Sequence, residues 1–324
     1  MIVSKTPFRI SFAGGGSDLP AFYKYRMGAV VSTSINKYMY VALNKRFEGG
    51  YRINYSLTET SDKISEINHP LVRECLRYLN ISLPLDISSL ADIPSGGTGL
   101  GSSSSYTVGL LKALCELLRL DKTNYEIASI ACQIEIDKCK EPIGKQDQFS
   151  ASLGGLNLLK FNVDNSVDVE KILISSKFKK LLENSFLIFH TNSSRNASKL
   201  LKIQSDYMTD ESKRKILEEM VELAFETKIC LENEDFKKFG EILDHNWILK
   251  KQITDKISNP EIDRYYSIAK RNGALGGKLL GAGEGGFLAI FAEQKNHNKI
   301  KSSLNNLTAI DIKFSEAGST SFRI

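Results

Sequence analysis

The chain has 324 residues, of which 42% are hydrophobic and 25% charged, as expected for a globular protein of one large or two average domains. Its net charge of +5 is mildly basic, but no run of lysine and arginine marks a nucleic-acid surface, so we expect no nucleic-acid partner. The sequence also has no stretch of about 18 apolar residues and no apolar signal segment at its start, so we expect no membrane partner.

The cysteines favour a reducing compartment. Their number is odd, and no two of them form a C-x-x-C pair. We therefore expect reduced core cysteines in a cytoplasmic protein. They are Cys75, Cys115, Cys132, Cys139 and Cys230.

The first half of the chain mixes strands with helices. Tyr51, Ile53 and Tyr55 alternate with polar neighbours, which is typical of a strand, and Thr123 and Glu126 form a capping-box pattern at the start of a helix. The predicted strands cover 30–46, 51–57, 85–89 and 153–161, and the predicted helices cover 69–79, 103–118 and 121–139.

The second half opens with a predicted strand over 185–190 and is then helical for roughly 80 residues, with a last strand near 309–314. The lysine-rich segment between the halves places a domain boundary near residue 180, which gives domains over 1–180 and 181–324. Strands and helices do not alternate strictly, so an α+β fold is favoured over a doubly wound sheet.

A glycine-rich loop feeds directly into the predicted helix over 103–118, in the stretch DIPSGGTGLGSSSSYTVGLLKAL. Glycines let backbone N–H groups approach an oxyanion, and a helix start adds unpaired donors and the positive end of the helix dipole. The loop lacks the lysine of a P-loop, so another group must neutralise a bound phosphate. Four serines at the helix start suit phosphate hydrogen bonds and a Mg²⁺ ligand, although a surface turn with a serine cap is the alternative.

Three stretches resemble the three motifs of the GHMP small-molecule kinases. They occur in the same order as in that family and together span the whole chain. They are TPFRISFAGGGSDLPAF over 6–22, PSGGTGLGSSSS over 94–105 and KLLGAGEGGFLAIF over 278–291. Within the family, RISFAGGGSDLP together with GKQDQ is most similar to the D-glycero-D-manno-heptose 7-phosphate kinases.

This resemblance implies a two-domain α+β fold, with an N-terminal half like domain 2 of ribosomal protein S5, a ferredoxin-like C-terminal half and an active site between them. It implies an ATP-dependent kinase that phosphorylates the anomeric hydroxyl of D-glycero-D-manno-heptose 7-phosphate to the 1,7-bisphosphate, for nucleotide-activated heptose synthesis. ATP and Mg²⁺ are the implied cofactors, a sugar phosphate is the implied partner, and the oligomeric state stays open.

The family motif also implies which residues bind the nucleotide and the metal. Mg²⁺ prefers oxygen ligands, and the matching positions here are Ser103 and Glu135. From the residues alone, an exposed glutamate of an amphipathic helix is the favoured reading, although Glu135 lies next to the apolar positions Ala131 and Ile134. The implied ATP phosphate-binding residues are Gly97, Gly99, Leu100, Gly101, Ser102, Ser103 and Ser104.

Asp147, in the loop segment GKQDQ, matches the residue that accepts or orients the proton of the substrate hydroxyl in this family. A carboxylate suits that role when a nearby cation keeps it ionised, and the candidate cations are Arg9, which is also assigned to catalysis, and Lys145. A turn aspartate is the alternative. The sequence does not decide whether Asp147 is a base or a positioning group.

The first motif implies a sugar site around Asp18, because a carboxylate and backbone N–H groups bind vicinal hydroxyls well. The alternative is a helix entry capped by Ser17 or Asp18. Arg195 is the candidate for the sugar phosphate, since a guanidinium next to a helix start pairs well with phosphate. The implied substrate-binding residues are Gly15, Gly16, Ser17, Asp18, Arg195 and Gly283.

One departure from the family lies in the third motif, where Glu284 replaces a glycine and would place a carboxylate near an anionic ligand. Two further functions are considered. The same fold could phosphorylate an unphosphorylated sugar such as L-fucose or galactose, or it could serve as a non-catalytic sugar and ATP sensor. Ser103, Glu135 and Asp147 are all present, which favours an enzyme.

Overall fold

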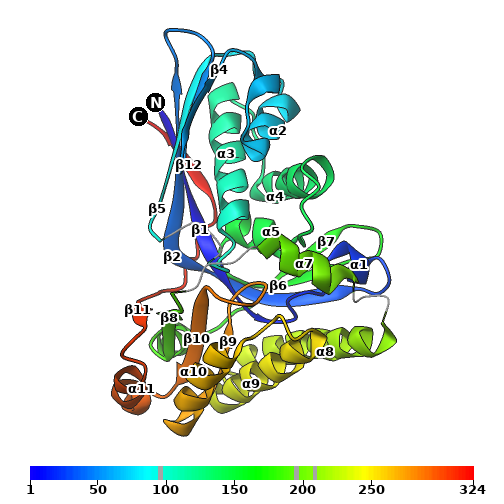
Figure 1. The fold of residues 1–324 in the computed structure, drawn as a ribbon, viewed down its shortest axis with the longest axis vertical. Coiled ribbons are helices and arrows are strands. Elements are labelled where there is room, and N and C mark those ends of the chain that lie inside the picture. Colours follow the sequence, from blue (N-terminus) through cyan, green and yellow to red (C-terminus); the bar gives the residue numbers. More distant parts are fainter. Residues whose placement is uncertain (94–97, 193–196, 207–209) are drawn as a thin grey trace.

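The computed structural model describes residues 1–93, 98–192, 197–206 and 210–324 (Figure 1). An eight-stranded sheet dominates the N-terminal half, with the order β12-β1-β2-β5-β3-β4 and with β6 and β7 joined through β2. The early part of β2 pairs with β6 and its later part with β5, so this single long strand carries both branches of the sheet. The strands are β1 (Ile2–Ala13), β2 (Gly28–Lys45), β3 (Tyr51–Asn54), β4 (Thr58–Ser61), β5 (Leu85–Ala91), β6 (Leu156–Phe161), β7 (Val167–Lys171) and β12 (Thr320–Arg323).

Helices cover one face of this sheet (Figure 1). In the central helix, α3, Gly109 allows close packing on the sheet, because a Cβ there would lie only 2.9 Å from Thr6 Oγ1. The capping box of Thr123 and Glu126 is confirmed at the start of α4. The helices are α1 (Pro20–Tyr23), which lies at the edge of the sheet, α2 (Pro70–Tyr78), α3 (Ser102–Leu118), α4 (Asn124–Cys132), which continues as the π-helix Gln133–Lys138, and α5 (Gln146–Leu153).

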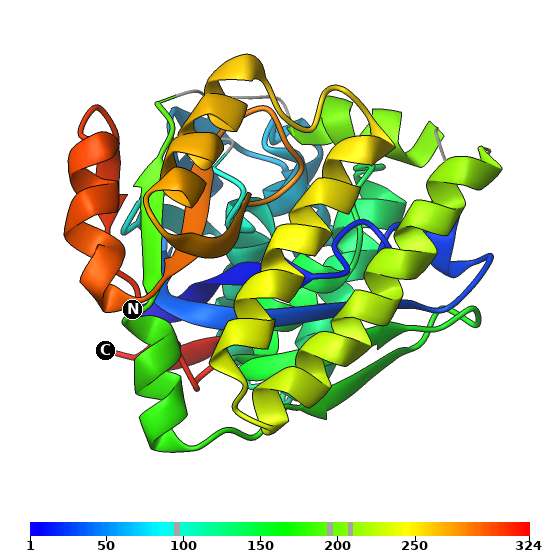
Figure 2. The ribbon, with the colours of Figure 1, turned by 90° about the horizontal axis from the view of Figure 1, so that it is seen from below.

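The C-terminal half contains a four-stranded antiparallel sheet of order β11-β8-β10-β9. Helices α8 and α9 lie side by side, with α8 against the first sheet and α9 against β9 of the second (Figure 2). Its strands are β8 (Phe186–His190), β9 (Ala274–Leu279), β10 (Phe287–Ala292) and β11 (Thr308–Ile310). Its helices are α6 (Ser176–Glu183), α7 (Ala197–Asp206), α8 (Glu211–Glu232), α9 (Phe236–Ile253), α10 (Pro260–Arg271) and α11 (His297–Ser303).

The two halves share one hydrophobic core. Phe12 of β1 stacks on Phe186 of β8 with 5.6 Å between ring centroids, and it meets Phe239 of α9 edge-on at 5.2 Å. Aromatic pairs of this kind add to the free energy of burial. The site between the halves is therefore built on a continuous, packed base.

The predicted boundary near residue 180 falls inside α6, between the strands of the two sheets. The C-terminal strand β12 nevertheless returns to the first sheet, where it pairs with β1 and brings the two termini together. This strand was not predicted. All five cysteines are free thiols, and no helix among the described residues is long and apolar enough to cross a membrane.

Candidate active site

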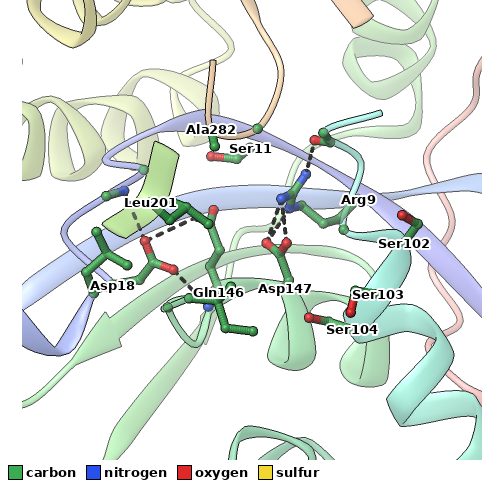
Figure 3. Close-up of a pocket in the computed structure, with 18 of the residues that line it drawn as sticks. Arg9, Ser11, Asp18, Ser102, Ser103, Ser104, Gln146, Asp147, Leu201 and Ala282 are labelled. Atoms are coloured by element: carbon green, nitrogen blue, oxygen red, sulfur yellow. Dashed lines mark hydrogen bonds and ion pairs between the residues drawn. The ribbon is translucent and has the colours of Figure 1, made fainter. Parts of the chain in front are cut away.

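A cavity of about 220 Å³ opens between the two halves and brings most of the predicted site residues together (Figure 3). Figure 3 shows Asp147 in its centre, with Ser102 to Ser104 on one side and Asp18 on the other. Its lining residues include Arg9, Gly15, Gly16, Asp18, Gly99, Gly101, Ser102, Ser103, Ser104 and Asp147 from the first half, and Lys250, Lys278, Gly281 and Ala282 from the second.

The glycine loop brings backbone close to the cavity. Gly99 and Gly101 both have positive φ, 78° and 77°, and a Cβ at Gly101 would lie 3.2 Å from Asp147 Oδ2. The buried Thr98 Oγ1 also lines the cavity and has no hydrogen-bond partner among the described residues. Leu100 is buried and lies behind the cavity wall, where its carbonyl accepts from the Arg9 amide. Gly97 lies outside the described residues.

Arg9 and Asp147 form a bidentate ion pair. Arg9 Nε and Nη2 donate to Asp147 Oδ1 and Oδ2, each at 2.7 Å, and Nη1 donates to the Gly99 carbonyl at 2.6 Å. The guanidinium is buried, whereas the Asp147 side chain is 24% exposed and faces the cavity. The pair fixes the carboxylate geometrically and connects it to the glycine loop.

Lys145, the other candidate cation, points away from Asp147. Its Nζ donates to the Asn165 carbonyl at 2.6 Å and to Asn165 Oδ1 at 2.7 Å, and it lies over the Tyr23 ring. Arg9, which comes from a strand far away in sequence, is therefore the partner of Asp147.

Asp18 is buried and faces the cavity from the sugar-motif loop. It does not cap α1, whose N-cap is Leu19; instead its Oδ1 accepts from the Gly16 amide at 3.0 Å. Burial, followed by the negative charge of Asp147, raises the pKa of Asp18. Ser17 lies outside the cavity lining, because its hydroxyl donates to the Gly14 carbonyl at 2.8 Å and accepts from the Ala29 amide.

Glu135 is fully buried below the start of α3, because it continues the inner helix face formed by the buried residues Ala131 and Cys132. Ser103 Oγ donates to Glu135 Oε1 at 3.1 Å, and Gln148 Nε2 donates to Oε2 at 2.5 Å. Burial raises the pKa of Glu135 to about 7, although the hydrogen bond from Gln148 and those from nearby hydroxyls act in the opposite direction. The exposed-glutamate alternative is therefore wrong.

The segment GKQDQ organises the site through three consecutive residues, two of which sequence reasoning missed. Gln146 donates from its backbone amide and from Nε2 to Asp18, both at 3.2 Å. Asp147 pairs with Arg9, and Gln148 holds the metal candidate Glu135. Both glutamines belong to the segment GKQDQ, so the motif was an available signal for them, although it does not specify their partners.

Two lysines of the second half were also missed. Lys250 of α9 and Lys278 of β9 line the cavity and are only 7% and 6% exposed. Lys250 Nζ donates to the Gly15 carbonyl at 2.8 Å, and Lys278 Nζ to the Phe12 carbonyl at 3.3 Å. Lys278 begins the third motif, which was an available signal, whereas no local pattern singles out Lys250.

The third motif contributes Gly281 and Ala282 to the cavity lining. Gly283 lies just beyond the cavity lining and packs against the backbone of the loop that connects α9 and α10. A Cβ at Gly283 would lie 2.9 Å from the Ile257 carbonyl oxygen. Glu284 has φ 61° and is not among the lining residues, so the departure from the family pattern puts no carboxylate in the cavity. Arg195 lies outside the described residues.

Comparison with known proteins agrees with this geometry. The sequence matches the family GHMP kinases N terminal domain over residues 70–155 and GHMP kinases C terminal over 227–309. It is 31% identical to the D-glycero-alpha-D-manno-heptose 7-phosphate kinase of Campylobacter jejuni, over 100% of this chain and 99% of that one. It is also 26% identical to the bifunctional fucokinase/GDP-fucose pyrophosphorylase of Arabidopsis thaliana, over 95% of this chain and 31% of the relative.

Among solved structures, a D-glycero-D-manno-heptose 1-phosphate kinase from Bacteroides thetaiotaomicron superposes with a TM-score of 0.82 at 25% identity, over 100% of this chain and 99% of the other. The 31% identity over the full length of the chain, the matches to both family domains and the shared two-domain α+β fold lead to one conclusion: this chain belongs to the GHMP kinases and is a sugar kinase that uses ATP as co-substrate.

Proposed function

We propose that this kinase transfers the γ-phosphoryl group of ATP to the anomeric hydroxyl of D-glycero-D-manno-heptose 7-phosphate and so forms the 1,7-bisphosphate. The Campylobacter jejuni relative carries the name of that activity. The observation that carries the proposal is the Arg9–Asp147 pair, which fixes a partly exposed carboxylate between the glycine loop and Asp18. An acceptor hydroxyl at Asp147 would face a phosphoryl group held at that loop.

The nucleotide phosphates lie, in this proposal, at the start of α3, where backbone N–H groups, the helix dipole and Ser102 to Ser104 meet them. Gly99 and Gly101 allow the backbone to approach, and Gly97 stays a prediction. A second cavity of about 580 Å³ shares Ser102 and Ser103 with the first and is lined by Tyr55, His69 and Tyr106. Its aromatic walls suit the adenosine of ATP.

Ser103 and Glu135 are the proposed ligands of Mg²⁺, which would neutralise the triphosphate. The donor set fits: a carboxylate and a hydroxyl are hard oxygen ligands, and the buried Gln148 Oε1 beside them has no hydrogen-bond partner among the described residues. Ser103 and Gln148 hold the carboxylate in place, and Asp147 orients the acceptor hydroxyl and takes its proton or positions it.

The acceptor sugar is proposed to bind Gly15, Gly16 and Asp18, whose backbone and carboxylate suit vicinal hydroxyls. Ser17, Leu100 and Gly283 support the backbone of their loops behind this surface. Arg195 stays a prediction for the sugar phosphate, and a cytoplasmic location stays a prediction from the cysteines.

A substrate panel tests the proposal. ADP formation with heptose 7-phosphate, mannose 6-phosphate, mannose, L-fucose and galactose should give the highest kcat/KM with heptose 7-phosphate. The fucokinase relative makes an unphosphorylated sugar the second candidate. A higher kcat/KM with L-fucose or galactose would replace the proposed acceptor.

A further inference from the structure

The acceptor side of the cavity holds more positive charge than the phosphoryl-transfer chemistry described above uses. Arg9 is neutralised by Asp147 through two short hydrogen bonds. Lys278 forms no ion pair with a carboxylate among the described residues, and its one hydrogen bond there, to the Phe12 carbonyl, is long at 3.3 Å. Burying an unpaired ammonium group in this way is unfavourable unless a ligand completes its environment.

The charges around Lys278 make its protonated, buried form less favourable still. Burial, followed by the positive charges of Lys250 and Arg9, lowers the pKa of Lys278 to about 7. Burial and the two neighbouring cations therefore all act on the pKa of Lys278 in the same direction. An anion in the cavity would oppose all of them.

A neutral hydrogen-bond donor lies in the same cavity. Ser11, on β1 between Arg9 and the sugar-motif loop, is 7% exposed, and its Oγ has no hydrogen-bond partner among the described residues. It belongs to the cavity lining, as do Lys250 and Lys278. A buried hydroxyl without a partner is unusual and indicates a ligand that the cavity accepts.

These groups lie on the acceptor side rather than the nucleotide side. Lys250 and Lys278 donate to the carbonyls of Gly15 and Phe12, in the segment that leads to Asp18. Figure 3 shows Ser11 beside Ala282, across the cavity from Ser104. A group that they bind would thus be part of the sugar.

We propose that Lys278, together with Lys250 and Ser11, binds an acidic group of the acceptor, so that this kinase selects a sugar phosphate over the corresponding neutral sugar. The proposal rests on the proposed function, because it assigns the second phosphate of that substrate to side chains of the C-terminal half. A lysine pair and a hydroxyl supply the charge-assisted hydrogen bonds that a phosphate needs.

The test compares two acceptors, heptose 7-phosphate and heptose, in wild type and Lys278→Met. Loss of a hydrogen bond to a charged group should lower kcat/KM for heptose 7-phosphate between about 10- and 150-fold, and kcat/KM for heptose less than about threefold. The KM for ATP should not change. Lys278→Arg, which keeps the charge, should recover part of the preference.

A matched control is Lys251→Met, because Lys251 pairs with Asp263 at 2.9 Å and is not part of the cavity lining. It should leave the preference for heptose 7-phosphate unchanged. Equal losses of kcat/KM with both sugars in Lys278→Met, or a raised KM for ATP, would overturn the proposal. A preference abolished by Arg195→Ala but retained in Lys278→Met would also overturn it.

Calorimetric titration of the two sugars without nucleotide separates this proposal from the proposed function. Wild type should bind heptose 7-phosphate more tightly than heptose, and Lys278→Met should lose that difference. If the difference is present but no phosphoryl transfer occurs, the anion subsite stands and the proposed function fails. Wild-type protein that binds heptose 7-phosphate no more tightly than heptose overturns the subsite.

Discussion

Replacing Lys278 by methionine should stabilise the folded protein, by an amount that depends on pH. The pKa of this lysine falls from 10.5 to about 7 on folding, a difference of 10.5 − 7 = 3.5. At 1.36 kcal/mol for each pH unit, folding therefore loses roughly 5 kcal/mol at pH 6, where the lysine is protonated in both states. Between pH 7 and 10.5 the unfolded chain binds more protons than the folded chain. The loss therefore shrinks as pH rises, to about 2 kcal/mol at pH 9.

Urea unfolding at pH 6 and pH 9 measures this, with the fluorescence of Trp247 as the signal, because it is the one tryptophan of the chain and is 1% exposed. The variant also loses the hydrogen bond to the Phe12 carbonyl, about 1 kcal/mol. The free energy of unfolding of Lys278→Met should then exceed that of wild type by about 4 kcal/mol at pH 6 and about 1 kcal/mol at pH 9. An excess that is the same at both pH values would refute the reasoning, since the lost contact alone does not depend on pH.

The remaining predictions concern catalysis. Asp147→Asn should lower kcat by roughly 10²- to 10⁴-fold with little change in the KM for ATP, and near-normal turnover would remove this residue from the mechanism. Ser103→Ala and Glu135→Gln should each raise the Mg²⁺ concentration needed for half-maximal rate, and the double variant should lose far less than the product of the single losses; multiplicative losses would argue against a shared ion. Gly101→Ala should lower both stability, by about 1–2 kcal/mol, and kcat, because its φ is +77° and its Cβ would approach Asp147. Gly49→Ala is the control, with φ +80° and no atom within 4 Å, and should lower stability alone; an equal effect of both on kcat would contradict the role of the loop.

Local sequence signals were sufficient for the elements whose caps and apolar periodicity lie within a few residues of one another. The capping box of Thr123 and Glu126 and the apolar face of α4 act within a few residues, and the structure has both as predicted. The described end of the glycine loop leads into α3 at Ser102. The strand β12 has four mostly exposed residues and owes its existence to pairing with β1 at the other end of the chain. No local sequence pattern predicts that residues 320–323 pair with a strand at the start of the chain.

The site shows the same division. The resemblance drew Arg9, Asp18 and Asp147 into one site, and the structure places all three on one cavity. Glu135 follows buried Ala131 and Cys132 at helical spacing, so the period of the helix already placed its side chain inward. The exposed alternative arose from the residue type, because glutamates are seldom buried.

The contribution of the C-terminal half was less accessible from sequence. Lys250 lies in an amphipathic helix with several lysines, and its contact with the Gly15 carbonyl, in the loop after β1, is not visible from that pattern. Burial alone does not indicate function, since Lys145 is equally buried, but a lysine that is buried and also lines the cavity is a candidate for binding a ligand.

The most direct test of the central claim is the identity of the product. Wild-type protein with ATP, Mg²⁺ and heptose 7-phosphate should be followed by ³¹P nuclear magnetic resonance. The account predicts one new phosphate signal coupled to the anomeric proton, formed in equal amount with ADP while the signal of the 7-phosphate persists. A new phosphate at any other position, or ADP formed without a sugar bisphosphate, would contradict it.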